Sequence, residues 1–181
     1  MTTGARALLG TLARPRDALL AGRIYGWLCV LPLLKRRLPL PRLVRLMWLR
    51  PRGTTRDRIR ERRTIRAVAR LSRVSGGNCL ERSLVLYRYL ARANADPRLV
   101  VGMARPDEYL GHVWVTVDGR PLLETTETLA SYTEVVGFGR GGAQVAVHSR
   151  AESAQQRYRP TDVESDGPST TSTGEQVSSG S

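Results

Sequence analysis

GGNCLERSLVLYRYL, residues 76–90, decides the fold because it places a cysteine at the predicted start of an amphipathic helix. After the turn-forming glycines, apolar side chains recur every three or four residues, which predicts one helix. Asn78 fits the N-cap position, and Glu81 falls three residues later, where the two can form a capping box. Cys79 then becomes the first helical residue. Unsatisfied N–H groups at a helix start favour a thiolate over a thiol and could also bind an oxyanion.

A small sheet is predicted after this helix. Asn94 fits the end of the helix because asparagine tolerates a left-handed conformation. Residues 98–104 and 112–117 are rich in β-branched side chains and predict two strands. Residues 120–124 predict a returning strand, joined to the second by the hairpin signal Asp118-Gly119. A nucleophile-bearing helix packed on a small antiparallel sheet is an α+β fold.

The hairpin has two possible registers, and they place different residues beside His112. A two-residue turn would pair Val117 with Arg120 and leave Glu124 in an apolar row. A three-residue loop would pair Thr116 with Arg120 and set Glu124 opposite His112. Because a shift of one residue exchanges the two faces of a strand, the apolar pattern favours the three-residue loop.

These residues together predict a catalytic triad for thiol acyl transfer. Cys79 is the expected nucleophile, His112 the base, and Glu124 the acid that orients the base. Asp118 is the rival acid, but it lies six residues along the strand from His112, about 20 Å away, which is too far. The other histidine, His148, receives no role.

The charge of the chain is unevenly distributed. A net charge of +13 comes from 28 arginines and a single lysine against 16 acidic residues, and residues 1–73 alone carry 19 basic and 3 acidic residues. Such an arginine excess fits codon bias better than a phosphate-binding surface, so we expect no nucleic-acid partner. Cys29 and Cys79 lack the neighbouring cysteines or histidines of a disulfide framework or metal site. This predicts a cytoplasmic protein without a metal or another cofactor.

Composition divides the chain into three expected segments. Residues 1–59 form a basic helical arm, interrupted by prolines such as Pro32, that wraps the core or contacts a protein partner or, peripherally, an anionic membrane. Its apolar stretch, residues 24–34, is expected to be too short to span a bilayer. Residues 60–149 form the catalytic core. Residues 150–181 have too few large apolar side chains to fold and predict a disordered tail.

Two motifs carry a family resemblance. Cys-Leu-x-Arg-Ser-Leu from Cys79, combined with His-x-Trp-Val-x-Val-Asp-Gly from His112, resembles the stand-alone B2 protein of lasso-peptide biosynthesis. The resemblance runs from about residue 60 to about residue 140 and implies the transglutaminase/papain-like core of a cysteine protease. It puts Cys79 and His112 in the catalytic positions, with Glu124 where the wider superfamily usually has aspartate. The Cys79 backbone N–H and the Asn78 side chain are the expected oxyanion donors.

The same resemblance implies a function and partners. The chain would be a leader peptidase that cleaves a ribosomally made lasso precursor, so that a separate asparagine-synthetase-like, ATP-dependent cyclase can close the ring. A separate leader-binding protein of the RRE type would present the precursor. Two alternatives stay open: transfer of the acyl group to an amine, as in a transglutaminase, and a non-enzymatic basic adaptor.

Overall fold

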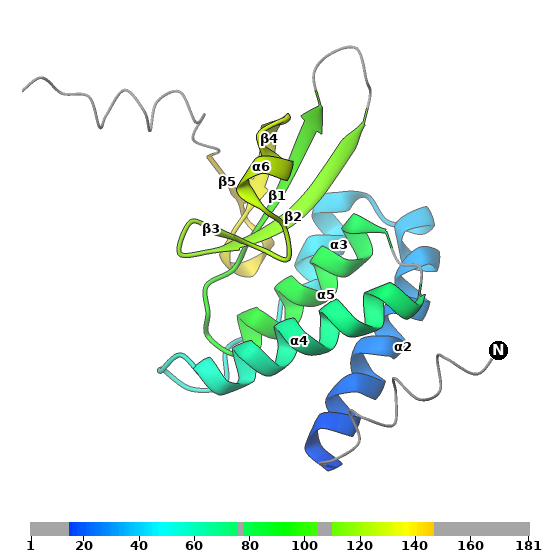
Figure 1. Ribbon diagram of the computed structural model, residues 1–181, viewed down its shortest axis with the longest axis vertical. Helices are drawn as coiled ribbons and strands as arrows, with labels where there is room; N and C mark the ends of the chain where they lie inside the picture. Colours follow the sequence, from blue (N-terminus) through cyan, green and yellow to red (C-terminus); the bar gives the residue numbers. More distant parts are fainter. Residues whose placement is uncertain (1–14, 76–77, 105–109, 147–181) are drawn as a thin grey trace, which may run out of the picture. The chain divides into compact units, whose positions relative to one another are not determined.

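The computed structural model describes residues 15–75, 78–104 and 110–146 (Figure 1). The predicted disordered tail at residues 150–181, His148 and the glycine pair at 76–77 lie outside these residues. The helices are α2 Pro15–Arg37, α3 Leu40–Met47, α4 Arg58–Ser75, α5 Cys79–Arg92, α6 Thr126–Leu129 and the 3-10 helix η1 Arg140–Gly142. The strands are β1 Arg98–Ala104, β2 Gly111–Val117, β3 Arg120–Leu122, β4 Tyr132–Phe138 and β5 Gln144–Val145.

The strands form one antiparallel sheet in the order β3-β2-β1-β4-β5. The predicted strands at residues 98–104 and 112–117 are confirmed as β1 and β2. Helix α5 is attached to the sheet where the Ser83 hydroxyl donates a hydrogen bond of 2.8 Å to the Val113 carbonyl. The predicted α+β fold, with the cysteine-bearing helix on a small antiparallel sheet, is therefore confirmed.

One hydrophobic core joins the helices to the sheet. Helices α2 and α3 contribute to it together with α4, α5 and the strands, so residues of the predicted basic arm share buried neighbours with the predicted catalytic core. Burying each large aliphatic side chain stabilises the fold by about 1.5–3 kcal/mol. The fully buried members include Ile24, Leu31, Leu43, Val44, Met47, Val68, Leu84, Leu90 and Leu99.

Helix α2 differs from its prediction because it continues through Pro32. Proline removes one backbone donor from a helix, but Leu28 and Leu31 just before it are buried in the core and hold the helix together. The segment Asp17–Arg37 is therefore long and apolar enough to cross a membrane, which corrects the prediction that this region is too short. Only 22% of its apolar window is buried in the structure, and that part includes Ile24, Leu28 and Leu31 of the core.

The hairpin between β2 and β3 has the register that the apolar pattern disfavoured. Val117 pairs with Arg120 across a two-residue turn at Asp118 and Gly119, whose φ angles are 52° and 73°. Positive φ at both central positions is the geometry of a type I′ turn. The predicted three-residue loop is therefore wrong. It assumed a strand of five residues, whereas β3 ends at Leu122, and Arg120 is exposed at the sheet edge, where its charge stays solvated.

Gly142 of η1 lies close against the backbone of α3. A Cβ atom placed on it would lie 2.8 Å from the Arg45 Cα and 2.9 Å from the Arg45 nitrogen, and its φ is +72°. Gly141 has nearly the same φ, +70°, but a Cβ there would have no neighbour within 4 Å. A comparison of substitutions at the two glycines therefore separates the cost of backbone strain from the cost of steric overlap.

We predict that Gly142→Ala lowers the free energy of unfolding by about 2–4 kcal/mol, because left-handed strain and overpacking add. Gly141→Ala should cost only about 1–2 kcal/mol of strain. Urea unfolding followed by circular dichroism measures both values. Equal losses for the two variants would contradict the close packing of η1 on α3.

Candidate active site

The start of α5 has the capping geometry that the sequence predicts. Asn78 Oδ1 accepts a hydrogen bond of 3.0 Å from the Glu81 N–H, and Glu81 Oε2 accepts one of 3.3 Å from the Asn78 N–H. Cys79 is the first residue of the helix, and its side chain is partly exposed. The N–H group of a first helical residue has no acceptor within its own helix. The thiol and a free backbone donor are therefore presented together.

Lys35 supports this helix start from α2, a contact that sequence reasoning missed. Its ammonium group lies 2.6 Å from Glu81 Oε1, and the Glu81 side chain is only 6% exposed. One carboxylate thus binds the Asn78 N–H through one oxygen and Lys35 through the other. A buried carboxylate is costly unless it is paired in this way. The only lysine of the chain holds the nucleophile-bearing end of α5 against α2.

His112 and Glu124 are neighbours in the structure, as the sequence predicts. His112 Nε2 lies 3.4 Å from Glu124 Oε1, and both side chains are largely shielded, with 16% and 12% exposure. The geometry at Nε2 does not complete a hydrogen bond. Instead, Arg82 of α5 donates a hydrogen bond to the same Glu124 oxygen. Arg82, which sequence reasoning also missed, therefore holds the carboxylate beside the imidazole.

The contact between Glu124 and His112 arises by a different route from the predicted one. In the observed register, a continued β3 would set Thr125 opposite His112. The strand ends at Leu122, however, and Leu123 has a φ of +63°, in the left-handed region. Such a conformation costs a bulky residue about 1–3 kcal/mol, and it occurs most often at functional sites. This turn of the backbone brings Glu124 to the imidazole.

Two aromatic rings surround the His112 imidazole. The Trp114 ring stacks with it at a centroid distance of 6.0 Å, and the Tyr132 ring lies 5.1 Å away at a tilt of 32°. Trp114 can lie there because β1 has Gly102 at this point, where a Cβ would come within 2.7 Å of the tryptophan ring. The His-x-Trp spacing could have indicated Trp114. Tyr132 could not be predicted, because it comes from β4 on the far side of β1.

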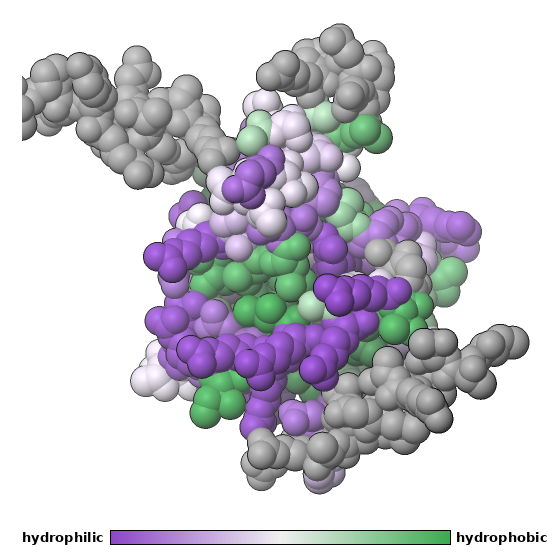
Figure 2. Space-filling view, viewed as in Figure 1, coloured by the Kyte–Doolittle hydropathy of each residue, from purple (hydrophilic) through white to green (hydrophobic). Residues whose placement is uncertain are grey.

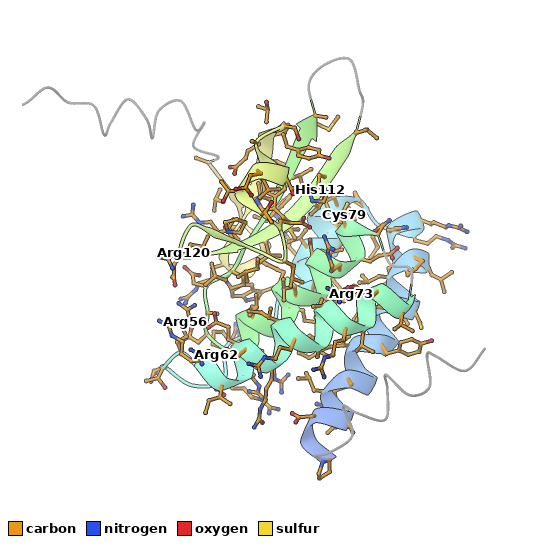
Figure 3. The ribbon with its side chains drawn as sticks, in the orientation of Figure 1. Arg56, Arg62, Arg73, Cys79, His112 and Arg120 are labelled. Carbon is orange, nitrogen blue, oxygen red and sulfur yellow. The ribbon has the colours of Figure 1, made fainter. Side chains whose placement is uncertain are left out.

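Cys79 lies on the side of α5 that faces this imidazole (Figure 3). Residues three and four apart share one face of a helix. Cys79 is therefore aligned with Arg82, which binds Glu124, and with Ser83, which binds the backbone of β2 beside His112. No hydrogen bond joins the Cys79 thiol to His112 within the described residues. The structure thus brings the predicted base and the predicted acid close together and has the predicted nucleophile on the adjoining helix.

The remaining predicted site residues have other partners. Asn78 Oδ1 accepts the capping hydrogen bond, and the amide nitrogen of this side chain is the group that could donate to an oxyanion. Asp118 lies 2.6 Å from Arg56, whose guanidinium group holds the pKa of the aspartate below its ordinary value. Asp118 is thus directed away from the imidazole. Among the residues that the structure describes, no three His, Cys, Asp or Glu side chains are grouped to hold a metal ion.

Comparison with known protein families identifies the superfamily of the chain. A family model described as the transglutaminase-like superfamily matches residues 27–137. The chain belongs to the transglutaminase-like superfamily. The match begins at Trp27 within α2, so the second half of this helix and α3 belong to the matched region. Membership suggests the activity of a cysteine protease or transferase. No curated protein and no solved structure matches the chain.

We predict that Lys35→Met lowers the free energy of unfolding of this transglutaminase-like domain by about 1–2 kcal/mol, because it leaves the Glu81 carboxylate without its cation. Lys35→Arg, which keeps the charge, is the matched control and should lose less. Urea denaturation of both proteins near neutral pH measures the difference. Wild-type stability of Lys35→Met would show that the contact with Glu81 does not secure the helix start.

Proposed function

We propose that the chain is a cysteine peptidase that removes the leader from a ribosomally made lasso-peptide precursor. The observation that carries this proposal is the contact of Glu124 Oε1 with His112 Nε2, held by Arg82 from the helix on which Cys79 is the first residue. It joins a nucleophile, a base and an acid in a superfamily of thiol enzymes.

The chemistry follows from which nitrogen faces the acid. Since Nε2 is turned to Glu124, Nδ1 is left to take the proton of the Cys79 thiol. The thiolate attacks the scissile carbonyl carbon, and the Cys79 N–H stabilises the developing oxyanion. His112 then protonates the leaving amine as the carbon–nitrogen bond breaks and a thioester forms. Water, deprotonated by His112, hydrolyses the thioester and restores the thiol.

The surface around the site suits a peptide. Figure 2 shows apolar surface between α4 and the β2–β3 hairpin, with hydrophilic side chains on both sides of it. Leu80, which follows Cys79, and Leu122 and Leu123, which precede Glu124, are partly buried and pack against the core. Apolar side chains of an extended precursor could occupy it. The expected partners are the precursor, an RRE-type leader-binding protein and a separate cyclase, and two unpaired cysteines support a cytoplasmic location.

Acyl transfer to an amine is the second candidate, because superfamily membership supports it as well as hydrolysis. The two outcomes differ at the thioester, which either water or an amine can attack. Mass spectrometry of the product separates them, because hydrolysis adds one water across a peptide bond and cross-linking of a glutamine releases ammonia. The precursor encoded by a neighbouring short reading frame is the substrate for this experiment.

We predict that Cys79→Ala and His112→Ala each abolish processing of that precursor, because removal of either member of a nucleophile–base pair costs nearly the whole chemical advantage. Cys29→Ala is the matched control, since Cys29 is exposed on α2 and should leave the rate unchanged. Mass spectrometry follows cleavage, and circular dichroism checks the fold. Cleavage by folded Cys79→Ala would exclude Cys79 as the nucleophile.

Glu124 and Asp118 can be compared in the same assay. Glu124→Gln should slow cleavage by roughly 10²-fold, because the amide no longer stabilises a protonated imidazole. Asp118→Asn should leave the rate within about twofold, since this side chain pairs with Arg56 instead. Each variant removes one negative charge, so they control for each other. The reverse ranking would refute the assignment of Glu124 as the orienting acid.

A further inference from the structure

A large pocket lies away from the candidate active site, between α2, the start of α4 and the end of α5. Its volume is about 1100 Å³. Two aspartates, Asp17 and Asp57, line it, against six arginines, which leaves a formal excess of four positive charges. The arginines are Arg23, Arg52, Arg60, Arg63, Arg88 and Arg92.

Four of these arginines converge without a carboxylate partner. Within the described residues, Arg63 pairs with Asp17 at 3.8 Å, whereas Arg23, Arg52, Arg60 and Arg92 form no ion pair. Burial and the charges of the other three lower the pKa of Arg92. Codon bias explains many arginines but not the convergence of unpaired ones from three helices and a loop. Like charges gathered in this way attract an anionic ligand.

The walls of the pocket are fixed and partly apolar. The loop before α4 is bound to the end of α5 through Asp57 N–H to Ala93 O at 2.9 Å and Asn94 Nδ2 to Thr54 O at 2.7 Å. Leu19, Val30 and Ile59 line the pocket with exposed side chains. A free phosphate ion would bind the arginines but would leave the exposed apolar side chains uncovered. A bilayer, which is broad and flat, would not enter a concave site.

We propose that this arginine pocket binds an acidic, amphipathic segment of the substrate polypeptide, at a distance from the bond that is cleaved. The proposal rests on the peptidase function proposed above. Carboxylates of the segment would pair with Arg23, Arg52, Arg60 and Arg92, and its apolar side chains would cover the exposed leucine, valine and isoleucine. Binding would relieve the repulsion among the arginines and remove apolar surface from water.

The placement of the pocket supports a segment of the substrate. Arg92 and Cys79 lie at opposite ends of α5, and at 1.5 Å per residue the 13 intervening steps make about 20 Å. An extended peptide covers that distance in about six residues. One precursor can therefore occupy the pocket and present a peptide bond to Cys79, with the rigid helix as the spacer between the two sites.

The first experiment measures binding separately from catalysis. The probe is a fluorescein-labelled 18-residue peptide with leucines on one helical face and glutamates elsewhere, and its twin has glutamine in place of each glutamate. Fluorescence anisotropy with Cys79→Ala protein, which keeps the pocket, should show at least roughly tenfold tighter binding of the acidic peptide, weakening with salt. Equal affinity for the twin would overturn the proposal.

Two double variants test the location. Arg60→Gln/Arg92→Gln should weaken binding of the acidic peptide roughly tenfold or more. Arg62→Gln/Arg73→Gln removes the same charge from exposed positions of α4 outside the pocket lining and should change it less than about threefold (Figure 3). Equal weakening by both pairs would mean that net charge, not the pocket, attracts the peptide. Binding of phosphatidylglycerol vesicles, but not peptide, through Arg60 and Arg92 would assign the pocket to a membrane.

Precursor processing then identifies the source of the segment. Arg60→Gln/Arg92→Gln should raise KM for the full precursor at least several-fold with kcat unchanged, and should not affect a short peptide that contains only the cleaved bond. If the effect appears only when the leader-binding protein is present, the pocket docks that protein and the proposal is wrong. Failure of the wild-type protein to cleave anything would refute the peptidase function, while the anisotropy result would still judge the pocket.

Discussion

The active-site arrangement depends on one buried carboxylate, that of Glu81. It accepts the Asn78 N–H through one oxygen and the Lys35 ammonium through the other, so it fixes both the first turn of α5 and the position of that turn against α2. Cys79 lies between the two capping residues and has no freedom to fray. The N–H groups that could receive an oxyanion are oriented by the same bonds. A flexible helix start would lose this orientation, because catalytic stabilisation requires donors that are already in place.

The second requirement is that the acid reach the base, and the fold meets it by ending a strand early. Strand β3 has only three residues, after which Leu123 adopts a left-handed conformation and brings Glu124 beside His112. Arg82 completes the link by joining this carboxylate to the nucleophile helix. The strain at Leu123 is offset by that ion pair and by partial packing of the leucine on the core. A locally unfavourable backbone is thus maintained beside the candidate catalytic residues.

These particulars show how far sequence reasoning extends. The capping box, β1, β2 and the presence of a hairpin at Asp118-Gly119 depend on neighbours in the chain and were predicted, whereas the length of the hairpin loop was predicted wrongly. Glu124 was assigned to His112 through a register that the structure contradicts, because the length of a short edge strand and a left-handed leucine leave no periodic signal. Lys35 is 46 residues from Glu81, and no local pattern connects them. Pro32 was expected to interrupt α2, but tertiary packing outweighed one lost hydrogen bond.

Helix α5 connects two regions in which the charges are arranged differently. The candidate active site lies at its start, and the arginine pocket lies at its end. At its start, acids and bases are paired one to one: Lys35 with Glu81, and Arg82 with Glu124. At its end, Arg23 of α2, Arg60 of α4 and Arg52 of the intervening loop meet around Arg92, and none of them forms an ion pair with another described residue. The partial negative charge of the helix C-terminus offsets some of this repulsion. A paired, shielded environment keeps the geometry of a reacting thiol and imidazole fixed. Arginines without carboxylate partners can still attract an anionic ligand. The rigid helix keeps the arginine pocket and the thiol about 20 Å apart.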